Sequence, residues 1–437
     1  MRKFFIKWVL TLCLLMTSTA FAQTREITFP FYDGSADYFT MKQSDDLYLS
    51  LYQLGTDMLF ESNIEPIVLG DTVLERLGAI GKMLPQITLW MVDANLFIPI
   101  THEEAHRAIL TDKGIGSISQ PFFNENGVAY VKGVTDATLE NLRDTDFPTF
   151  IRMHTAGNES DYCIAQKAFQ RFTFLDDTEI DYAKMPSLLW SYFFREISIW
   201  NYVGHTYHSG GIDEPEEADE LERDIVGDDI SGMIHHLFNP TAEYHRYWTT
   251  ADFSDEENAF LKRVYLRTWL DFPIINPMLF NRFSFQLGDS TKMSFNTGYC
   301  LAPFGDFIDE KFYFRVDDVL HGPLEFSLTA RQYQNKENWF PEFILTCQRF
   351  SPFSWLTLNA AGDIWWQPED LSFTTDKAQL GGSVTLGCNV YPLKKLEGAK
   401  FDFGLNFNLM YKTAGFMPEV ISLDKDFALT AGISVRY

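Results

Sequence analysis

The stretch FDFGLNFNLMY, residues 401–411, decides the fold class of the carboxy-terminal half. Large apolar side chains occupy every second position, and aspartate, glycine and asparagine alternate with them until Met410 breaks the pattern. Successive side chains of a strand point to opposite faces, so this period of two predicts a strand with one apolar and one polar face. The stretch is also longer than the usual strand of about five or six residues.

The same alternation recurs through the last third of the chain. It is clearest again in the final segment, 427–437, and it is present at 283–287, 293–299, 312–316, 324–332, 343–349, 356–366 and 380–390. Aromatic residues gather near the segment ends, at Trp339, Phe350, Phe353, Trp355, Trp365, Trp366 and Tyr391. Strands of about ten residues with an apolar outer face and aromatic ends are typical of a transmembrane β-barrel.

We therefore expect an antiparallel outer-membrane β-barrel over residues 281–437. A soluble antiparallel sandwich is the alternative, but its outward faces would be less apolar. Lipid cannot form hydrogen bonds with the backbone groups of an open sheet edge, so we expect the strands to close into a barrel. The number of strands should be even, either eight or ten. The alternating last strand with its terminal aromatic, Tyr437, also resembles the assembly signal of bacterial outer-membrane proteins.

The amino terminus predicts export. Arg2, Lys3 and Lys7 accompany an apolar run, and Ala20-Phe21-Ala22 offers a small-x-small cleavage site, so residues 1–22 read as a signal peptide. Removing these three basic residues from a net charge of −25 leaves −28. Such an acidic chain repels nucleic acid, which we exclude as a partner. The four remaining cysteines are widely spaced and predict no disulfide framework.

Between the leader and the barrel, residues 23–280 predict a mainly helical domain. Apolar residues recur at helical spacing over 47–59 and 73–84. The run 87–98 is apolar on nearly every side, which predicts a buried helix leading into the segment 100–107. The segments 117–123 and 128–131 are expected to form short strands or an active-site loop. Further helices are expected over 164–174 and 190–200. The acidic run 214–224 is most simply a solvated surface.

The chemistry of this domain centres on IleThrHisGluGluAlaHisArg, residues 100–107. His102 and His106 are four residues apart, so on a helix both imidazoles lie on one face and can hold one metal ion. Glu103 follows the first histidine and can take a proton from a water at that metal. Pro99 and Gly114 suit the start and the end of such a helix.

This H-E-x-x-H motif resembles that of the zincin metallopeptidases, although Glu104 and Arg107 are charged where that family's pattern is uncharged. The resemblance implies Zn²⁺ as the cofactor, His102 and His106 as ligands and Glu103 as the general base. In the gluzincin branch a Glu on a following helix completes the ligand set. Glu159, in His154-Thr155-Ala156-Gly157-Asn158-Glu159-Ser160-Asp161, is the expected third ligand. Asp161 and His154 are the competing candidates, and a helix start capped by Asn158 is the non-functional interpretation.

Eight of the nine histidines lie between positions 102 and 245. Metallopeptidases need a donor that stabilises the developing oxyanion, and we assign this catalytic role to His208. His205, Tyr207, His235 and His236 are alternatives, and ordinary packing or solvation remains open for each.

The sequence thus predicts an α+β multidomain protein, a zincin-like helical domain followed by a barrel. We expect a zinc-dependent hydrolase, a peptidase acting on envelope proteins or peptides, embedded in outer-membrane lipid. One alternative is a non-enzymatic barrel with a helical plug or scaffold. Another keeps the metal but acts on an amide or ester of envelope material. An even strand number puts both barrel ends on one side, so the helical half should face the periplasm unless it packs into or against the barrel.

Overall fold

The computed structural model describes residues 25–58, 88, 91–124, 128–174, 187–211, 217–271, 275–391 and 401–437. The expected signal peptide and the helix expected over 73–84 lie outside these residues. The described part combines seven α-helices with a ten-stranded antiparallel sheet. A mixed fold with a helical part and an antiparallel strand part is therefore confirmed.

All nine strands expected from alternation are present. The described strands run in the hydrogen-bonded order β1-β12-β11-β10-β9-β8-β7-β6-β5-β4, and no described pairing joins β1 to β4. Their bounds are β4 (Phe285–Gln286), β5 (Thr291–Ala302), β6 (Gly305–Val319), β7 (Gly322–Gln334), β8 (Trp339–Phe353), β9 (Leu356–Pro368), β10 (Ala378–Val390), β11 (Asp402–Lys412) and β12 (Asp426–Arg436).

The tenth strand differs from expectation, because it lies in the region assigned to the helical domain. β1 (Glu26–Asp33) pairs antiparallel with β12, with Ile27 opposite Val435. The register shifts between Pro30 and Tyr32. Proline cannot donate a hydrogen bond to a neighbouring strand and is confined to edges and bulges. This irregularity breaks the period of two, so the alternation does not reveal the strand.

The two faces of the sheet are inverted relative to a soluble protein. On β11, Phe403, Leu405, Phe407 and Leu409 are between 41 and 46% exposed, whereas Asn406 on the opposite face is buried. Exposed apolar side chains of the same kind continue across β7, β8, β10 and β12. A contiguous apolar surface of this size is a contact surface and not an ordinary solvated face.

The helices are α2 (Met41–Thr56), α4 (Ile98–Asp112), α5 (Asp136–Thr145), α6 (Phe147–Phe172), α7 (Ser187–Ser209), α8 (Asp229–Phe238) and α9 (Asp255–Thr268). A separate hairpin pairs β2 (Ile118–Gln120) with β3 (Tyr130–Lys132), near the two short strands expected there. No helix in the described ranges is long and apolar enough to cross a membrane.

Two helical expectations need correction. The run expected as one buried helix from 87 includes a π-helical turn, Asp93–Phe97, and Met91 on it is 62% exposed. The segment around Asn158 is no helix start: it lies inside α6, which Asp146 caps by accepting a hydrogen bond from the Thr149 amide. Sequence spacing placed the start of α6 too late because its first half is rich in small and polar residues.

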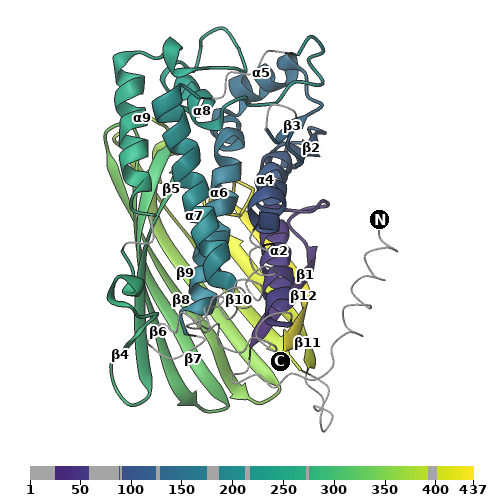
Figure 1. Ribbon diagram of the computed structural model, residues 1–437, viewed down its shortest axis with the longest axis vertical. Coiled ribbons are helices and arrows are strands. Elements are labelled where there is room, and N and C mark those ends of the chain that lie inside the picture. The colour runs from purple at the N-terminus through teal and green to yellow at the C-terminus, as the bar shows by residue number, and fades with distance from the viewer. Residues whose placement is uncertain are drawn as a thin grey trace, which may run out of the picture.

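The helices pack against the polar face of the sheet. The sequence allowed this packing as the exception to a helical half that faces the periplasm. Figure 1 shows the sheet curving around α6 and its neighbours. Tyr162 of α6 donates to Asp309 of β6, and Thr173 at the end of α6 donates to Ser294 of β5 at 2.7 Å. The buried polar face of the sheet is therefore satisfied by helix side chains rather than by bulk water.

The two ends of the sheet differ. The register puts Glu26 opposite Arg436 at the end that also carries the two-residue turns 320–321 and 354–355. The opposite end carries the connections 369–377 and 413–425. Short and long connections occur at both ends, since the two-residue turn 303–304 lies at this opposite end and the connection 391–401 lies at the end with Arg436. In Figure 1 the C-terminus lies at the lower end, and α5, α8 and the β2–β3 hairpin project beyond the upper end.

Candidate metal centre

The histidine pair lies on a helix, as the motif predicts. Pro99 occupies the first turn of α4, and Gly114, with φ of 72°, follows its end. His102 and His106 lie one turn apart with ring centroids separated by 5.0 Å. Both rings face α6 and the start of α8.

The third member of the group is Asp229, the first residue of α8. Its Oδ2 atom lies 3.2 Å from His102 Nε2 and 3.4 Å from His106 Nε2. One ligand atom from each of these three residues lies within 4.8 Å of the others, an arrangement able to hold a metal ion. Asp228, the N-cap of α8, accepts a hydrogen bond from the Ser231 amide at 2.8 Å and so fixes the position of Asp229.

The second nitrogen of each imidazole is already occupied. His106 Nδ1 lies 2.5 Å from the carbonyl oxygen of Met153, which only accepts, so this nitrogen carries the hydrogen. His102 Nδ1 lies 3.0 Å from Asp161 Oδ2. A carboxylate or carbonyl behind the imidazole is the usual support of a metal-bound histidine, because it leaves the other nitrogen free to ligate.

Asp161 is itself held in place. Arg195 of α7 donates to its Oδ1 atom and also to the Thr101 hydroxyl at 2.6 Å. The side chain that the sequence offered as a competing third ligand therefore orients a ligand instead.

A glycine permits the close approach of α4 and α6. A Cβ atom built on Gly157 would lie 2.2 Å from His102 Nε2, far inside van der Waals contact. Because a side chain at this position has to displace the imidazole, the glycine in the His154–Asp161 stretch makes room for the site.

A cavity of about 640 Å³ opens beside the three residues. Glu103, 7% exposed, lines it together with Tyr202, Asn158, His205 and Asp224. Tyr202 places its ring edge-on to His102, and its hydroxyl accepts a hydrogen bond from the Asp229 amide at 3.0 Å. The group is thus accessible to a small molecule from one side.

The electrostatics of the site favour a bound cation. Burial raises the pKa of the Glu103 carboxyl and raises that of Asp224 well above its usual value. Burial acts in the same direction on Asp229, but the imidazoles of His106 and His102 outweigh it and hold its pKa below the ordinary range. Burial lowers the pKa of His102, whereas its contacts with Asp161 and Asp229 raise it well above normal. The carboxylates therefore favour positive charge at this position, either protons on the imidazoles or a metal ion beside them.

Glu159 does not join this group, which corrects the expected ligand set. Its buried carboxylate accepts hydrogen bonds from Arg152, at 3.0 Å from Nε and 2.6 Å from the terminal nitrogen, and from the Glu419 amide at 2.7 Å. Arg152 also donates to the carbonyls of Val420 and Ile421. Two residues correspond to about 200° around a helix, so when Asp161 faces α4, Glu159 faces away from it. Glu159 ties down the loop 413–425.

The other histidines proposed from the sequence lie at different places relative to the cavity. His208 is exposed and packs against Tyr207 and Tyr265, outside the cavity, so the structure does not bring it to the site. His154 is buried between Phe150 and His236, where burial lowers its pKa to about 3. His205 is the histidine of α7 that lines the cavity.

Asp229 is the residue that sequence reasoning missed. It lies five residues beyond the acidic run 214–224, which is interpreted from the sequence as a solvated surface. The available signal was the Asp228-Asp229 pair immediately before the apolar run IleSerGlyMetIle, because an N-cap followed by a first-turn carboxylate marks a helix start. Only the packing of α8 against α6 shows that this start faces α4.

The comparisons with known proteins add little. No protein-family model matches the chain, and no curated protein matches it. Among solved structures, the NanC porin in its rhombohedral crystal form is similar over 35% of this chain and 74% of that chain, with 9% identity and a TM-score of 0.25. A likeness this low carries no argument, so the fold description rests on the strands and helices themselves.

Proposed function

We propose that this protein is a zinc-dependent hydrolase, a peptidase, held in the outer membrane by its strand half. One observation carries the proposal. The Nε2 atoms of His102 and His106 both face the Asp229 carboxylate. The Nδ1 atom of His106 donates to the Met153 carbonyl, and we assign the Nδ1 atom of His102 as the donor to Asp161 in the same way. A carboxylate repels two nitrogen lone pairs that face it, unless the imidazoles are protonated or a metal ion lies between them.

The donor set suits zinc. Two imidazoles and one carboxylate with an open fourth position form one of the usual catalytic zinc sites. Zinc bound there supplies the Lewis acidity that lowers the pKa of a water molecule to about 7. Asp229 takes the place proposed for Glu159, and the rest of the expected set, His102 and His106, is retained.

Glu103 has the position and the environment of a general base. It lines the same cavity, and its raised pKa is suited to accepting a proton near neutral pH. The carboxylate takes one proton from the attacking water, and the carboxylic acid then gives it to the departing amine of a peptide. Tyr202 and His205 line the cavity as candidate donors to the oxyanion, in place of His208.

The apolar outer face of the strands supports membrane insertion. β12 ends at the end of the sheet opposite α5 and α8, together with the two-residue turns 320–321 and 354–355. The other connections are mixed, because the two-residue turn 303–304 lies at the helical end and the long connection 391–401 lies at the terminal end. With the last strand ending in the periplasm, as expected from the sequence, α5 and α8 face the cell surface, contrary to the periplasmic placement expected when the helices were assumed to hang below the terminal strand ends.

A pair of cysteine variants tests this orientation. Asp219→Cys lies in the exposed stretch before α8, and His321→Cys lies in the exposed turn between β6 and β7. A membrane-impermeant maleimide should label the first on intact cells and the second only after the outer membrane is permeabilised. The reverse labelling would restore the periplasmic placement.

Metal analysis tests the hydrolase itself. The full chain purified in detergent should carry about one zinc per molecule, and Asp229→Asn and His102→Ala should lose it. His205→Ala, which alters the same cavity but removes no proposed ligand, should keep it. A folded protein that neither carries nor takes up zinc would overturn the proposal.

That outcome would favour the second candidate, a non-enzymatic barrel with a helical plug. The observation behind it is the buried network that joins α6 to β5 and β6. Amide or ester substrates from the envelope remain an alternative for the same metal site, and hydrolysis of a fluorogenic peptide library separates them from peptides.

A further inference from the structure

A second cavity lies between the helices and the polar face of the sheet. It measures about 500 Å³ and is lined by α2, α6, the loop 413–425 and the inner faces of β1 and β8–β12. Its lining residues include none of the three proposed zinc ligands. Ligand sites commonly have volumes of about 300–1,000 Å³.

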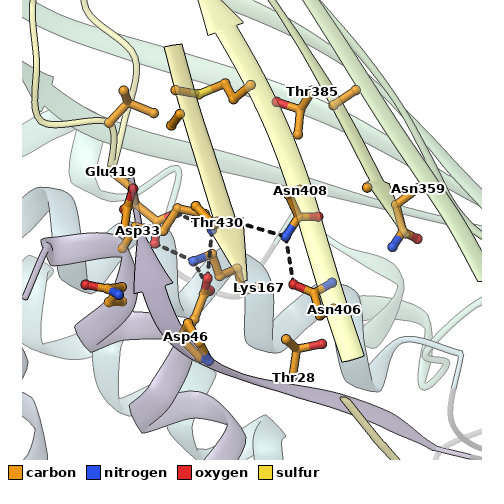
Figure 2. Close-up of a pocket in the computed structure, with 18 of the residues that line it drawn as sticks. Thr28, Asp33, Asp46, Lys167, Asn359, Thr385, Asn406, Asn408, Glu419 and Thr430 are labelled. Carbon is orange, nitrogen blue, oxygen red and sulfur yellow. Dashed lines mark hydrogen bonds and ion pairs between the residues drawn. The ribbon is translucent and has the colours of Figure 1, made fainter. Parts of the chain in front are cut away.

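The part of the sheet side formed by β9–β11 is uncharged and rich in hydrogen-bonding groups. The flanking strands carry charges, of which Glu325 pairs with Arg349 and Glu26 pairs with Arg436. Figure 2 shows amide and hydroxyl side chains from neighbouring strands turned toward it, among them Asn359, Thr385, Asn406, Asn408 and Thr430. Asn406 donates to Asn389 at 2.6 Å, and Asn408 donates to Asn406 at 2.8 Å and to Thr430 at 3.2 Å. These bonds fix the orientation of the amides along the wall.

Most charges on the helix side pair with one another, whereas Arg171 donates to the neutral side chains of Ser50 and Gln53, at 3.5 and 3.1 Å. Lys167 of α6 contacts Asp46 of α2 at 2.5 Å and also contacts Glu419 in the loop, as Figure 2 shows. Lys42 contacts the same Asp46 at 2.7 Å. A charged ligand has to compete with these pairs, whereas an uncharged ligand leaves them intact.

We propose that this cavity binds an uncharged, hydroxyl-rich molecule of mono- to disaccharide size. Hydroxyl groups both donate and accept hydrogen bonds, and so match a wall whose amide and hydroxyl groups supply donors and acceptors. The ring of Tyr38 lines the cavity beside Asp112, to which its hydroxyl donates at 3.0 Å, and offers a flat apolar surface. The proposal does not depend on the zinc site.

The test uses calorimetric titration of the full chain in detergent. The neutral probes are glucose, N-acetylglucosamine and maltose, and the charged ones are glucuronate and glucosamine. At least one neutral saccharide should bind saturably, with an affinity at least about tenfold above that of the charged probes, a difference of about 1.4 kcal/mol. No binding by any neutral probe, or equal binding of the charged probes, would overturn the proposal.

Three variants, one of them a control, locate the binding. Ala361 of β9 lines the cavity, and Ala361→Leu should fill it and weaken binding at least about tenfold. Ala330→Leu makes the same change on β7 opposite the 53% exposed Phe343, away from the cavity, and should leave binding unchanged. Thr385→Val, nearly equal in size, removes one lining hydroxyl and should weaken binding even if the larger substitution unfolds the sheet. Unchanged affinity in Thr385→Val and in a folded Ala361→Leu would place the ligand elsewhere.

Discussion

Two buried clusters of charge in this protein have opposite characters. In the sheet cluster, Asp309 receives two hydrogen bonds from Arg331, at 2.7 and 3.0 Å, and Arg331 also contacts Glu342 at 3.1 Å. In the helix cluster, the Asp229 carboxylate faces the Nε2 atoms of His102 and His106.

A permanent cation within the cluster separates a structural network from a site. The sheet cluster contains its own cation, a guanidinium with fixed donors that match both carboxylates. The helix cluster places Asp229 against two imidazoles that are neutral unless protonated, next to a cavity. The paired network is complete without a ligand, whereas the charge of Asp229 is balanced only when the imidazoles are protonated or a metal ion is bound.

The largest expected effect is on turnover. Glu103→Gln should retain zinc, because Glu103 is no ligand, and should lower hydrolysis of a fluorogenic peptide by about 10²–10⁴-fold, the usual contribution of a general base. Glu104→Gln is the matched control on the same helix, since Glu104 pairs with Arg107 instead of facing the cavity. Equal activity in the two variants would exclude Glu103 as the base.

The next effect is on stability and concerns the sheet cluster. Arg331→Met should lower the free energy of unfolding by about 3–5 kcal/mol, because it leaves Asp309 and Glu342 buried without their cation. Lys377→Met breaks the exposed ion pair with Glu369 and should change the free energy of unfolding by no more than about 1 kcal/mol. Urea unfolding in detergent measures both. If Arg331→Met proved as mild as Lys377→Met, the sheet cluster would not be the complete network described above.

A smaller change should separate two helical glycines. Gly157→Ala pushes a methyl group against His102 and should cost about 1–3 kcal/mol and weaken zinc binding. Gly55→Ala in α2 meets nothing within 4 Å and should stabilise the protein by about 0.4–1 kcal/mol. Thermal unfolding with zinc titration compares them. Tight zinc binding by Gly157→Ala would contradict the packing of α4 against α6.

The smallest effect is a pH dependence of the zinc-free protein. Burial lowers the pKa of His106, but the Asp229 carboxylate outweighs it and raises the pKa, as the carboxylates do for His102. The resulting stability is fully present below the ordinary imidazole pKa of about 6.5 and is lost as pH rises through the raised value. The melting temperature with chelator should therefore fall above about pH 6.5, and added zinc should reduce that fall. Identical curves with and without zinc would contradict a shared site for protons and metal.

Much of the fold was predictable from short-range pattern. The alternation in 401–411 and its eight counterparts located nine strands, because a strand exposes alternate residues to two different environments. The helical spacing of His102 and His106 placed both on one face of α4 for the same local reason. The alternation did not predict β1 because Pro30 interrupts its period of two. The sequence did not identify Asp229 as a site residue because a carboxylate at a helix start gives the same sequence pattern whether it is solvated or part of a site.

The strand half, its apolar outer face and the motif helix follow from the sequence, since each depends on the period of one continuous segment. Which carboxylate faces the histidines depends instead on packing between segments that are distant in the sequence. Glu159 and Asp161 are two residues apart, yet one ties down the loop 413–425 and the other supports His102. Asp229 lies 123 positions beyond His106, and no local period links two such positions: the packing of α4 and α8 against α6 brings them within 3.4 Å.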